Sequence, residues 1–189
     1  MKLKAVAAVC RSNKTLVICR QDGRQLVGNG HALYDVRGLP EMMPEEVLRM
    51  FDVKEEQISN WYIPDVRMEM PYNFRDDDAE EEELHNDLLA IQYLCDLVQP
   101  LHTEAGEIIF VDKDLLKPID GEMTRYFLRR KENGERYVVI KDGLLFEALI
   151  MPYDMITSEL CEKLEKLWRA CAEACSKAYR EKMETTEET

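Results

Sequence analysis

Seven carboxylates crowd one short stretch of this 189-residue chain and form its densest group of chemically active side chains. Clustered carboxylates can hold a divalent cation, but this run lacks the glycine and the alternate spacing of a calcium-binding loop. The alternative is a solvated acidic surface that pairs with arginines and lysines of a partner. The predicted partner-binding residues of this acidic run are Asp76, Asp77, Asp78, Glu80, Glu81, Glu82 and Glu83.

A second cluster has the opposite charge and lies farther along the chain. Between residues 125 and 141 six bases outnumber two acids, with Tyr126, Phe127 and Tyr137 among them. Bases mixed with aromatic side chains suit single-stranded nucleic acid. This basic hairpin can equally attract the acidic run of the same chain. The alternative nucleic-acid-binding residues are Arg125, Arg129, Arg130, Lys131, Arg136 and Lys141.

No pattern for metal, nucleophilic or nucleotide chemistry accompanies these clusters. The histidines His31, His85 and His102 are widely separated and no Cys-x-x-Cys pair occurs, so we predict no metal site. Signatures of phosphate-binding loops, of dinucleotide binding and of a serine nucleophile elbow are also missing. We therefore expect no cofactor and no enzymatic activity. An enzyme of unfamiliar type is the third alternative, and it would need residues that only the fold brings together.

Six cysteines would indicate a disulfide framework in a small secreted chain. No signal peptide is recognisable before Cys10, and no apolar run approaches the roughly 20 residues of a membrane span. We expect a cytoplasmic protein without membrane contact, whose cysteines are reduced and mostly buried. Cys171 and Cys175, four positions apart, are expected in the core beneath a terminal helix.

The formal charge of −13 is unevenly distributed along the chain. Between Asp65 and Asp87 ten acids outnumber two arginines, whereas the remaining residues are nearly balanced. A uniformly acidic surface would repel nucleic acid, because binding depends on neutralising phosphates. Two clusters of opposite charge can instead face a partner or each other.

The elements that must position these clusters are mainly strands joined in hairpins. Asp22-Gly23, Asn133-Gly134 and Asp142-Gly143 are dipeptides that favour tight hairpin turns. Helices are predicted over residues 44–51, 52–58 and 112–118, and from Thr157 onward. Strands are predicted over residues 4–10, 15–20, 24–27, 31–36, 107–111, 124–131, 136–141 and 144–151.

Two segments carry further expectations. Apolar residues at helical spacing favour one helix over residues 79–98, although residues 89–94 and 96–101 would also serve as two short strands. The final helix has one apolar stripe, which we expect to pack over the sheet. The residues of this stripe are Leu160, Leu164, Leu167, Cys171, Ala174 and Ala178.

These patterns predict an α+β protein with a mainly antiparallel, hairpin-rich sheet covered by helices and a long C-terminal amphipathic helix. We expect a β-rich N-terminal half over residues 1–70 and an acidic segment over 71–87. A C-terminal α+β half over 88–182 and a disordered tail over 183–189 complete the chain, and together these parts are expected to form one compact unit.

Five stretches resemble small acidic proteins carried by prophages and mobile elements of gut Firmicutes, most of which have no assigned activity. More loosely, the chain is similar to anti-CRISPR inhibitors of type II-A Cas9. Those proteins are non-enzymatic as a rule, and several occupy surfaces meant for DNA. The stretches are Leu26–Tyr34, Gly38–Pro40, Leu48–Asp52, Asp114–Pro118 and Gly143–Pro152.

The resemblance implies a mobile-element protein that acts in the cytoplasm of a bacterial host. Its expected partner is a host nucleic-acid-handling enzyme, namely Cas9 or its guide-RNA complex, and the acidic run would stand in for phosphates of DNA. The alternative is a DNA- or RNA-binding accessory protein that uses the basic hairpin. For that alternative, Ile108–Met151 is similar to a half-domain of ring-shaped sliding clamps.

Overall fold

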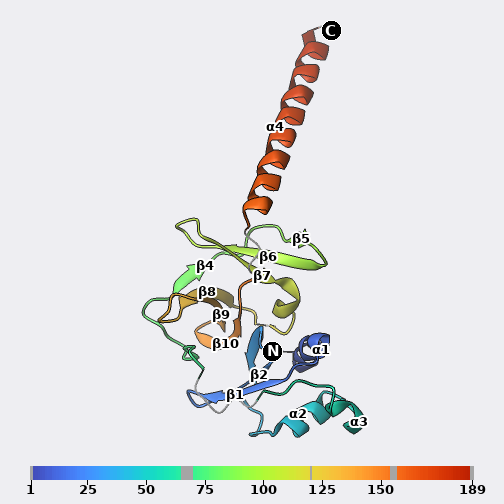
Figure 1. Ribbon diagram of the computed structural model, residues 1–189. Coiled ribbons are helices and arrows are strands. Elements are labelled where there is room, and N and C mark those ends of the chain that lie inside the picture. The colour runs from blue at the N-terminus through green and yellow to red at the C-terminus, as the bar shows by residue number, and fades with distance from the viewer. Residues whose placement is uncertain (1, 65–69, 120, 154–156, 188–189) are drawn as a thin grey trace. The chain divides into compact units, whose positions relative to one another are not determined.

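The computed structural model describes residues 2–64, 70–119, 121–153 and 157–187, with side chains up to residue 177 (Figure 1). The chain divides into two compact units, Met1–Tyr153 and Asp154–Thr189. The elements are α1 (Leu3–Asn13), β1 (Val17–Gln21), β2 (Arg24–Gly28), β3 (Ala32–Asp35), α2 (Pro44–Met50), α3 (Glu55–Ile58), β4 (Glu82–Leu84), β5 (Ile91–Tyr93), β6 (Asp96–His102), β7 (Ile108–Asp112), the 3-10 helix η1 (Lys113–Leu116), β8 (Thr124–Arg130), β9 (Arg136–Asp142), β10 (Leu145–Ile150) and α4 (Ser158–Glu187).

The first unit is built on a sheet of seven strands in the order β1-β2-β3-β10-β9-β8-β4, in which every neighbouring pair is antiparallel. Leu33 of β3 lies opposite Leu149 of β10, so strands from both ends of this unit share one sheet. A smaller antiparallel sheet contains β5, β6 and β7. The predicted α+β class is therefore confirmed.

The hairpins form where the turn dipeptides predict them. Asp22 and Gly23 have φ angles of 54° and 72°, and two positive angles in succession are what a type I′ turn requires. The predicted strands that flank this turn are β1 and β2, and those around the later two turns are β8, β9 and β10. The helix predicted over residues 44–51 is α2.

The N-terminal strand predicted over residues 4–10 is wrong, because residues 3–13 form helix α1. Val6, Ala7 and Cys10 lie on one face of this helix and are buried. Their spacing of one and three residues is helical, and this face packs into the core. Lysines at positions 2 and 4 give the sequence the polar–apolar alternation of a strand, but both lysines are exposed and lie outside the buried helix face.

The helix predicted over residues 79–98 is also wrong. β4 pairs with β8, and β5 pairs with β6 across a turn in which Leu94 has a φ of 53°. The alternative of short strands is therefore the one that forms. A helix here would have buried Leu84 and Leu88 on one face, whereas in the fold Leu84 is buried and Leu88 is 41 % exposed.

The seven-stranded sheet has an apolar core on each face. On one face α1, α2 and the smaller sheet pack on the strands, and the Tyr34 hydroxyl donates to the carbonyl of Leu115 at 2.8 Å. On the other face Phe74 packs edge-to-face on Phe146, with 5.9 Å between ring centroids. Phe74 belongs to the segment just before the acidic run, so this core fixes where that run begins.

The second unit is helix α4, and the predicted cap at Thr157 is confirmed because its Oγ1 accepts from the backbone N–H of Leu160 at 3.2 Å. Its described side chains, at residues 158–177, are exposed except for half-buried Leu160. The packing of the apolar stripe over the sheet stays a prediction. Residues 183–187, predicted to lie in a disordered tail, are helical, and residues 188–189 lie outside the described part of the chain.

The cysteines depart from their predicted burial. Cys10 and Cys19 are buried, and burial raises the pKa of Cys10 to about 12. Cys171 and Cys175 are exposed, so the prediction that they lie in the core is wrong. Cys95 and Cys161 are exposed too, and all six cysteines are free. Within the described ranges, no helix has the length and apolar character to cross a membrane.

Candidate acidic interface

Aromatic packing positions the acidic run on the sheet. Phe74 is fully buried, and the ring of Tyr72 meets that of Tyr137 edge-on at 5.2 Å. The backbone N–H of Asn73 donates to the Tyr137 hydroxyl at 3.1 Å. The carboxylates that follow therefore start from a fixed point on the sheet.

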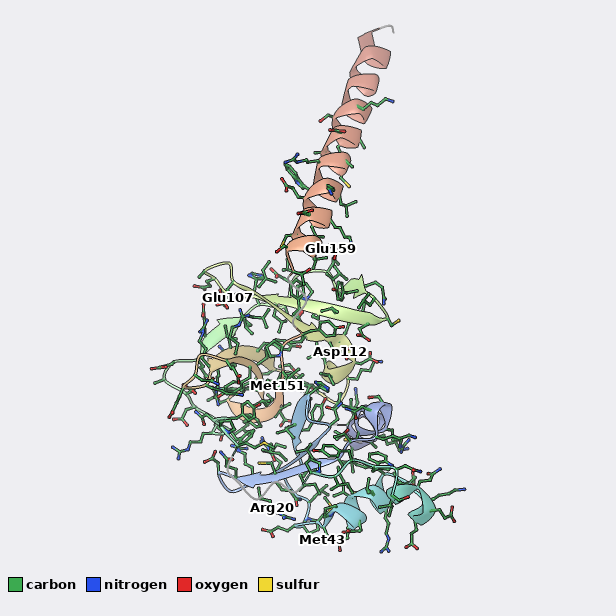
Figure 2. The ribbon with its side chains drawn as sticks, viewed as in Figure 1. Arg20, Met43, Glu107, Asp112, Met151 and Glu159 are labelled. Carbon is green, nitrogen blue, oxygen red and sulfur yellow. The ribbon has the colours of Figure 1, made fainter. Side chains whose placement is uncertain are left out.

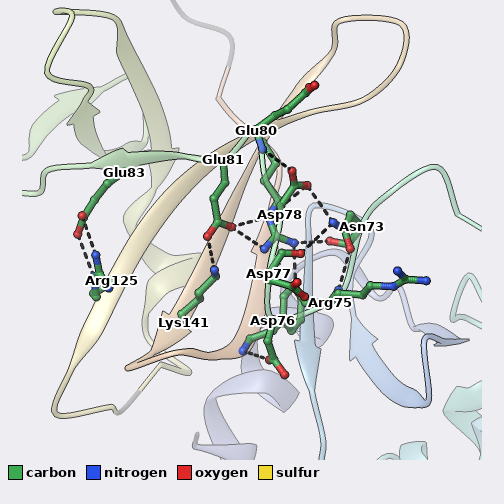
Figure 3. Close-up of polar contacts among 12 residues, drawn as sticks. Asn73, Arg75, Asp76, Asp77, Asp78, Glu80, Glu81, Glu83, Arg125 and Lys141 are labelled. Atoms are coloured by element: carbon green, nitrogen blue, oxygen red, sulfur yellow. Dashed lines mark hydrogen bonds and ion pairs between the residues drawn. The ribbon is translucent and has the colours of Figure 1, made fainter.

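Arg129 of β8 is the residue on which the polar contacts of this region converge. Its side chain is fully buried, and its Nε and Nη2 donate to Glu81 Oε2 at 2.9 and 2.6 Å. Its Nη1 donates to the carbonyls of Asn73 and Arg75 at 2.9 and 3.0 Å. Lys141 of β9 donates to the other oxygen of Glu81 (Figure 3). Buried charges of this kind are tolerated when they are paired and hydrogen-bonded.

Two aspartates of the run are held by donors from other parts of the chain. Asp76 Oδ1 accepts from the Phe146 backbone N–H at 2.7 Å and pairs with Arg24 at 2.7 Å. Asp78 accepts from the Asn73 side-chain amide at 2.9 Å. Its other oxygen accepts from the backbone N–H two residues later at 3.0 Å. These contacts fold the run back onto the sheet.

The same contacts decide the acidity of these carboxyls. Burial raises the pKa of Asp76, but the Phe146 N–H and the Arg24 guanidinium outweigh it, so this pKa lies below its ordinary value. The pKa of Asp78 is likewise lowered, because hydrogen bonds and the nearby cations outweigh burial. The pKa of Glu83 is lowered mainly by its hydrogen bonds to Arg125, at 2.9 and 2.7 Å.

Every cation of the predicted nucleic-acid-binding hairpin is paired with a carboxylate of the same chain. The acidic run supplies the partners of four of them, and Glu107 and Glu135 supply the rest. The two clusters therefore face each other. The pairs are Arg125 with Glu83, Arg129 with Glu81, Arg130 with Glu82 and Glu107, Lys131 with Glu135, Arg136 with Glu107, and Lys141 with Glu81.

Four carboxylates at and beside the sheet edge formed by β4 stay at least partly open to solvent. Asp77 and Glu80 are exposed, and neither carboxylate has a cation among the described residues. Figure 3 shows Glu80 pointing away from the ion-pair cluster. Glu82 and Glu83 keep 37 and 44 % of their side chains exposed although each has an ion pair. We call these four residues the acidic edge.

The fold also brings together a histidine pair that the sequence analysis missed. His85 and His102 exchange backbone hydrogen bonds, and their rings lie 5.3 Å apart. His102 Nε2 lies 2.7 Å from Asp87 Oδ1, and this hydrogen bond raises the pKa of His102 and lowers that of Asp87. Only the strand register could have revealed the pair. No group of three metal-ligating side chains occurs in the described part of the chain.

A groove of about 960 Å³ was likewise not evident from the sequence. It lies beside the turn between β1 and β2, and Arg20, Arg24, Arg37 and Arg75 are among its lining residues. Buried Asp35 joins two of them, because its Oδ2 accepts from Arg24 at 2.6 Å and from Arg37 at 3.2 Å. These residues are far apart in the sequence, so no local sequence pattern predicts the groove.

Comparison of the chain with protein-family models, with curated proteins and with solved structures finds no match. The function of the site is therefore inferred from the contacts of its own residues.

Proposed function

We propose that this chain is a non-enzymatic binding protein that blocks a basic surface on a nucleic-acid-handling enzyme of a bacterial host. The proposed contact surface is the acidic edge, and not the whole acidic run. The observation that carries the proposal is that Asp77 and Glu80 are exposed and have no cation among the described residues.

The charge distribution supports this narrower surface. Carboxylates can take the place of phosphates against arginines and lysines, and complementary charge mainly governs specificity and association rate. Within the described residues, every carboxylate of the acidic run except those of Asp77 and Glu80 has an ion pair in the chain, so a partner would have to compete with a formed ion pair to use it. The same pairing of the basic hairpin is the reason that we do not propose nucleic-acid binding there.

The experiment measures inhibition of DNA cleavage by a type II-A Cas9–guide RNA complex, the first target that the loose likeness to anti-CRISPR proteins indicates. Asp77→Asn combined with Glu80→Gln should weaken inhibition about fivefold at low salt, because two exposed charge pairs contribute roughly 1 kcal/mol together. Raising the salt concentration should narrow that difference. Glu45→Gln combined with Glu56→Gln removes the same charge from exposed positions of α2 and α3 and should leave inhibition unchanged.

Two results would count against the proposal. Equal inhibition by the Asp77/Glu80 double variant and the unaltered protein would exclude the acidic edge as the contact surface. If the unaltered protein does not inhibit the Cas9 complex, that target is wrong. A pull-down from host lysate with both proteins would then show whether any captured enzyme depends on the acidic edge.

A further inference from the structure

A cavity beside the 3-10 helix η1 lies outside the acidic edge. Its volume of about 590 Å³ is within the range of small-molecule sites, about 300–1,000 Å³. Its lining residues all belong to the first unit and come from the loop between β4 and β5, from β6, from η1 with the residue after it, and from β8. Asp112, labelled in Figure 2, ends β7 directly before η1. We call this space the η1 cavity.

Gln99 of β6 gives the η1 cavity a fixed hydrogen-bond acceptor. Only 5 % of this residue is exposed. Its Nε2 donates to the carbonyls of Leu88 and Pro100 at 2.8 and 3.2 Å, and because both partners are acceptors the amide cannot be turned around. Its Oε1 accepts from no described residue. Asp35 Oδ1 is the one described side-chain atom that is both sealed from solvent and unpaired, so Gln99 Oε1 opens to the cavity that this residue lines.

Tyr126 of β8 contributes a donor to the same cavity. Its hydroxyl oxygen accepts from the side-chain amide of Asn86 at 3.3 Å, and its own O–H has no acceptor among the described residues. Burial raises the pKa of Tyr126, so the hydroxyl keeps its proton at neutral pH. An almost buried acceptor and a half-buried donor therefore line one cavity, and each is available to a ligand.

Lys113 is the cation of this cavity that has no carboxylate partner in the described chain. The other charged groups of the lining are already engaged. Lys117 pairs with Asp114 at 2.7 Å, and Asp87 is hydrogen-bonded to His102 at 2.7 Å. A ligand carboxylate can therefore pair with Lys113 without displacing an existing ion pair.

Three leucines supply the apolar part of the lining. Leu88 precedes β5, Leu97 belongs to β6 and Leu116 belongs to η1. An apolar side chain of a ligand that packs on them is removed from water, which is the main favourable term in binding. Apolar walls with a few fixed polar groups are the usual composition of a small-molecule site.

We propose that the η1 cavity binds an apolar N-acyl amino acid, a chemistry shared by the free compound and by the C-terminal residue of a peptide. The amide N–H of the ligand donates to Gln99 Oε1, and the acyl carbonyl accepts from the Tyr126 hydroxyl. The carboxylate pairs with Lys113, and the apolar side chain packs on the three leucines. A secondary amide suits this lining because it carries a donor and an acceptor on neighbouring atoms.

Two other ligand classes fit the lining less well. A free amino acid brings an ammonium group, and the described lining has no uncommitted carboxylate to meet it. A phosphorylated ligand brings about two negative charges, whereas Lys113 is the single described lining cation without an ion pair. One neutral acceptor, one neutral donor and one cation match an amide that lies beside a single carboxylate.

An NMR titration of the full-length protein with N-acetyl-L-leucine tests the proposal. Two modified probes isolate the contacts, because the N-methylated compound lacks the N–H and N-acetyl-L-leucinamide lacks the carboxylate. Each should bind about fivefold more weakly than N-acetyl-L-leucine, since each loses one hydrogen bond or ion pair. Equal binding of all three probes would overturn the assigned contacts.

Substitutions in the cavity provide the matching protein variants. Tyr126→Phe and Lys113→Gln should each weaken N-acetyl-L-leucine about fivefold. Lys113→Gln should leave the affinity for N-acetyl-L-leucinamide unchanged, because that probe has no carboxylate for the lysine to meet. Tyr62→Phe and Lys54→Gln make the same changes at residues that do not line the cavity and should have no effect. An equal loss for both probes in Lys113→Gln would overturn the pairing of Lys113 with the carboxylate.

A third arm distinguishes the two sources of this chemistry. The probe is a pentapeptide of four alanines and a C-terminal leucine, with a free or an amidated C-terminus. If the free-acid peptide binds more tightly than N-acetyl-L-leucine and amidation weakens it, the source is a protein C-terminus. If N-acetyl-L-leucine binds and the peptide does not, the source is the free compound. If neither probe shifts the resonances of residues that line the cavity, the proposal is wrong.

Discussion

Arg129 shows how one buried side chain holds the acidic run against the sheet. Its guanidinium donates to Glu81 and to two backbone carbonyls, and its side chain has no exposed surface. Arginine suits this place because its planar fork of donors can serve several acceptors at once. Lys141 meets the other oxygen of Glu81 as a compact point charge. The charge pattern indicated that the two clusters could attract each other, but not which residue would be buried.

Replacing Arg129 with Ala should lower the free energy of unfolding by about 3–5 kcal/mol, because half-buried Glu81 would lose its Arg129 donors and two backbone carbonyls would lose theirs. Arg130→Ala is the matched control. Its side chain is 42 % exposed, and loss of its ion pairs should cost less than about 1 kcal/mol. Urea unfolding followed by circular dichroism measures both, and equal losses would contradict this account.

At the scale of elements, turn residues predicted the hairpins correctly. The sequence-based predictions were wrong where contacts between distant residues decide between helix and strand. Asp22-Gly23 needs positive φ angles that few residues adopt, so its sequence specifies its turn directly. Residues 4–10 carry an apolar pattern that fits either a strand or a helix, and the core contact of Val6 and Cys10 selects the helix. Residues 82–84 form a strand because they pair with the edge of β8. The sequence of residues 82–84 alone gives no sign of this pairing.

The contribution of the acidic run to the stability of the fold should decrease in acid. Asp76, Asp78 and Glu83 have lowered pKa values, so their contribution to stability is fully present above their unfolded pKa of about 4. That contribution is lost as the pH falls through their lowered folded pKa values. The urea midpoint should therefore fall as the pH is lowered below about 4.

Asp76→Asn provides the control for this pH dependence. It removes one of the three carboxyls with a lowered pKa, so the urea midpoint should depend less steeply on pH in acid than in the unaltered protein. The amide resonance of Phe146, which donates to Asp76, reports the same event locally by NMR. A midpoint that stays constant from about pH 6 to pH 3 would show that these carboxyls contribute no net stability.

At the scale of the whole molecule, the net charge of −13 does not show that many of the acidic side chains are paired with basic side chains of the same chain. In the first unit four cations of the basic hairpin pair with acids of the acidic run, whereas Asp77 and Glu80 of the acidic edge have no cation among the described residues. Sequence patterns located both the charged clusters and the apolar stripe, but exposure depends on tertiary contacts between residues far apart in the chain.

Removing residues 154–189 should leave the stability of the first unit unchanged. The described core clusters of the sheet contain no residue of α4, and the described side chains of α4 are exposed beyond Leu160. Deleting the helix therefore removes no residue of these two cores, and buried apolar surface is the main source of stability. The measurement is the urea midpoint of the shortened and full-length chains at one concentration. A clear fall on shortening would show that the apolar stripe packs on the first unit, as its amphipathic pattern alone predicts.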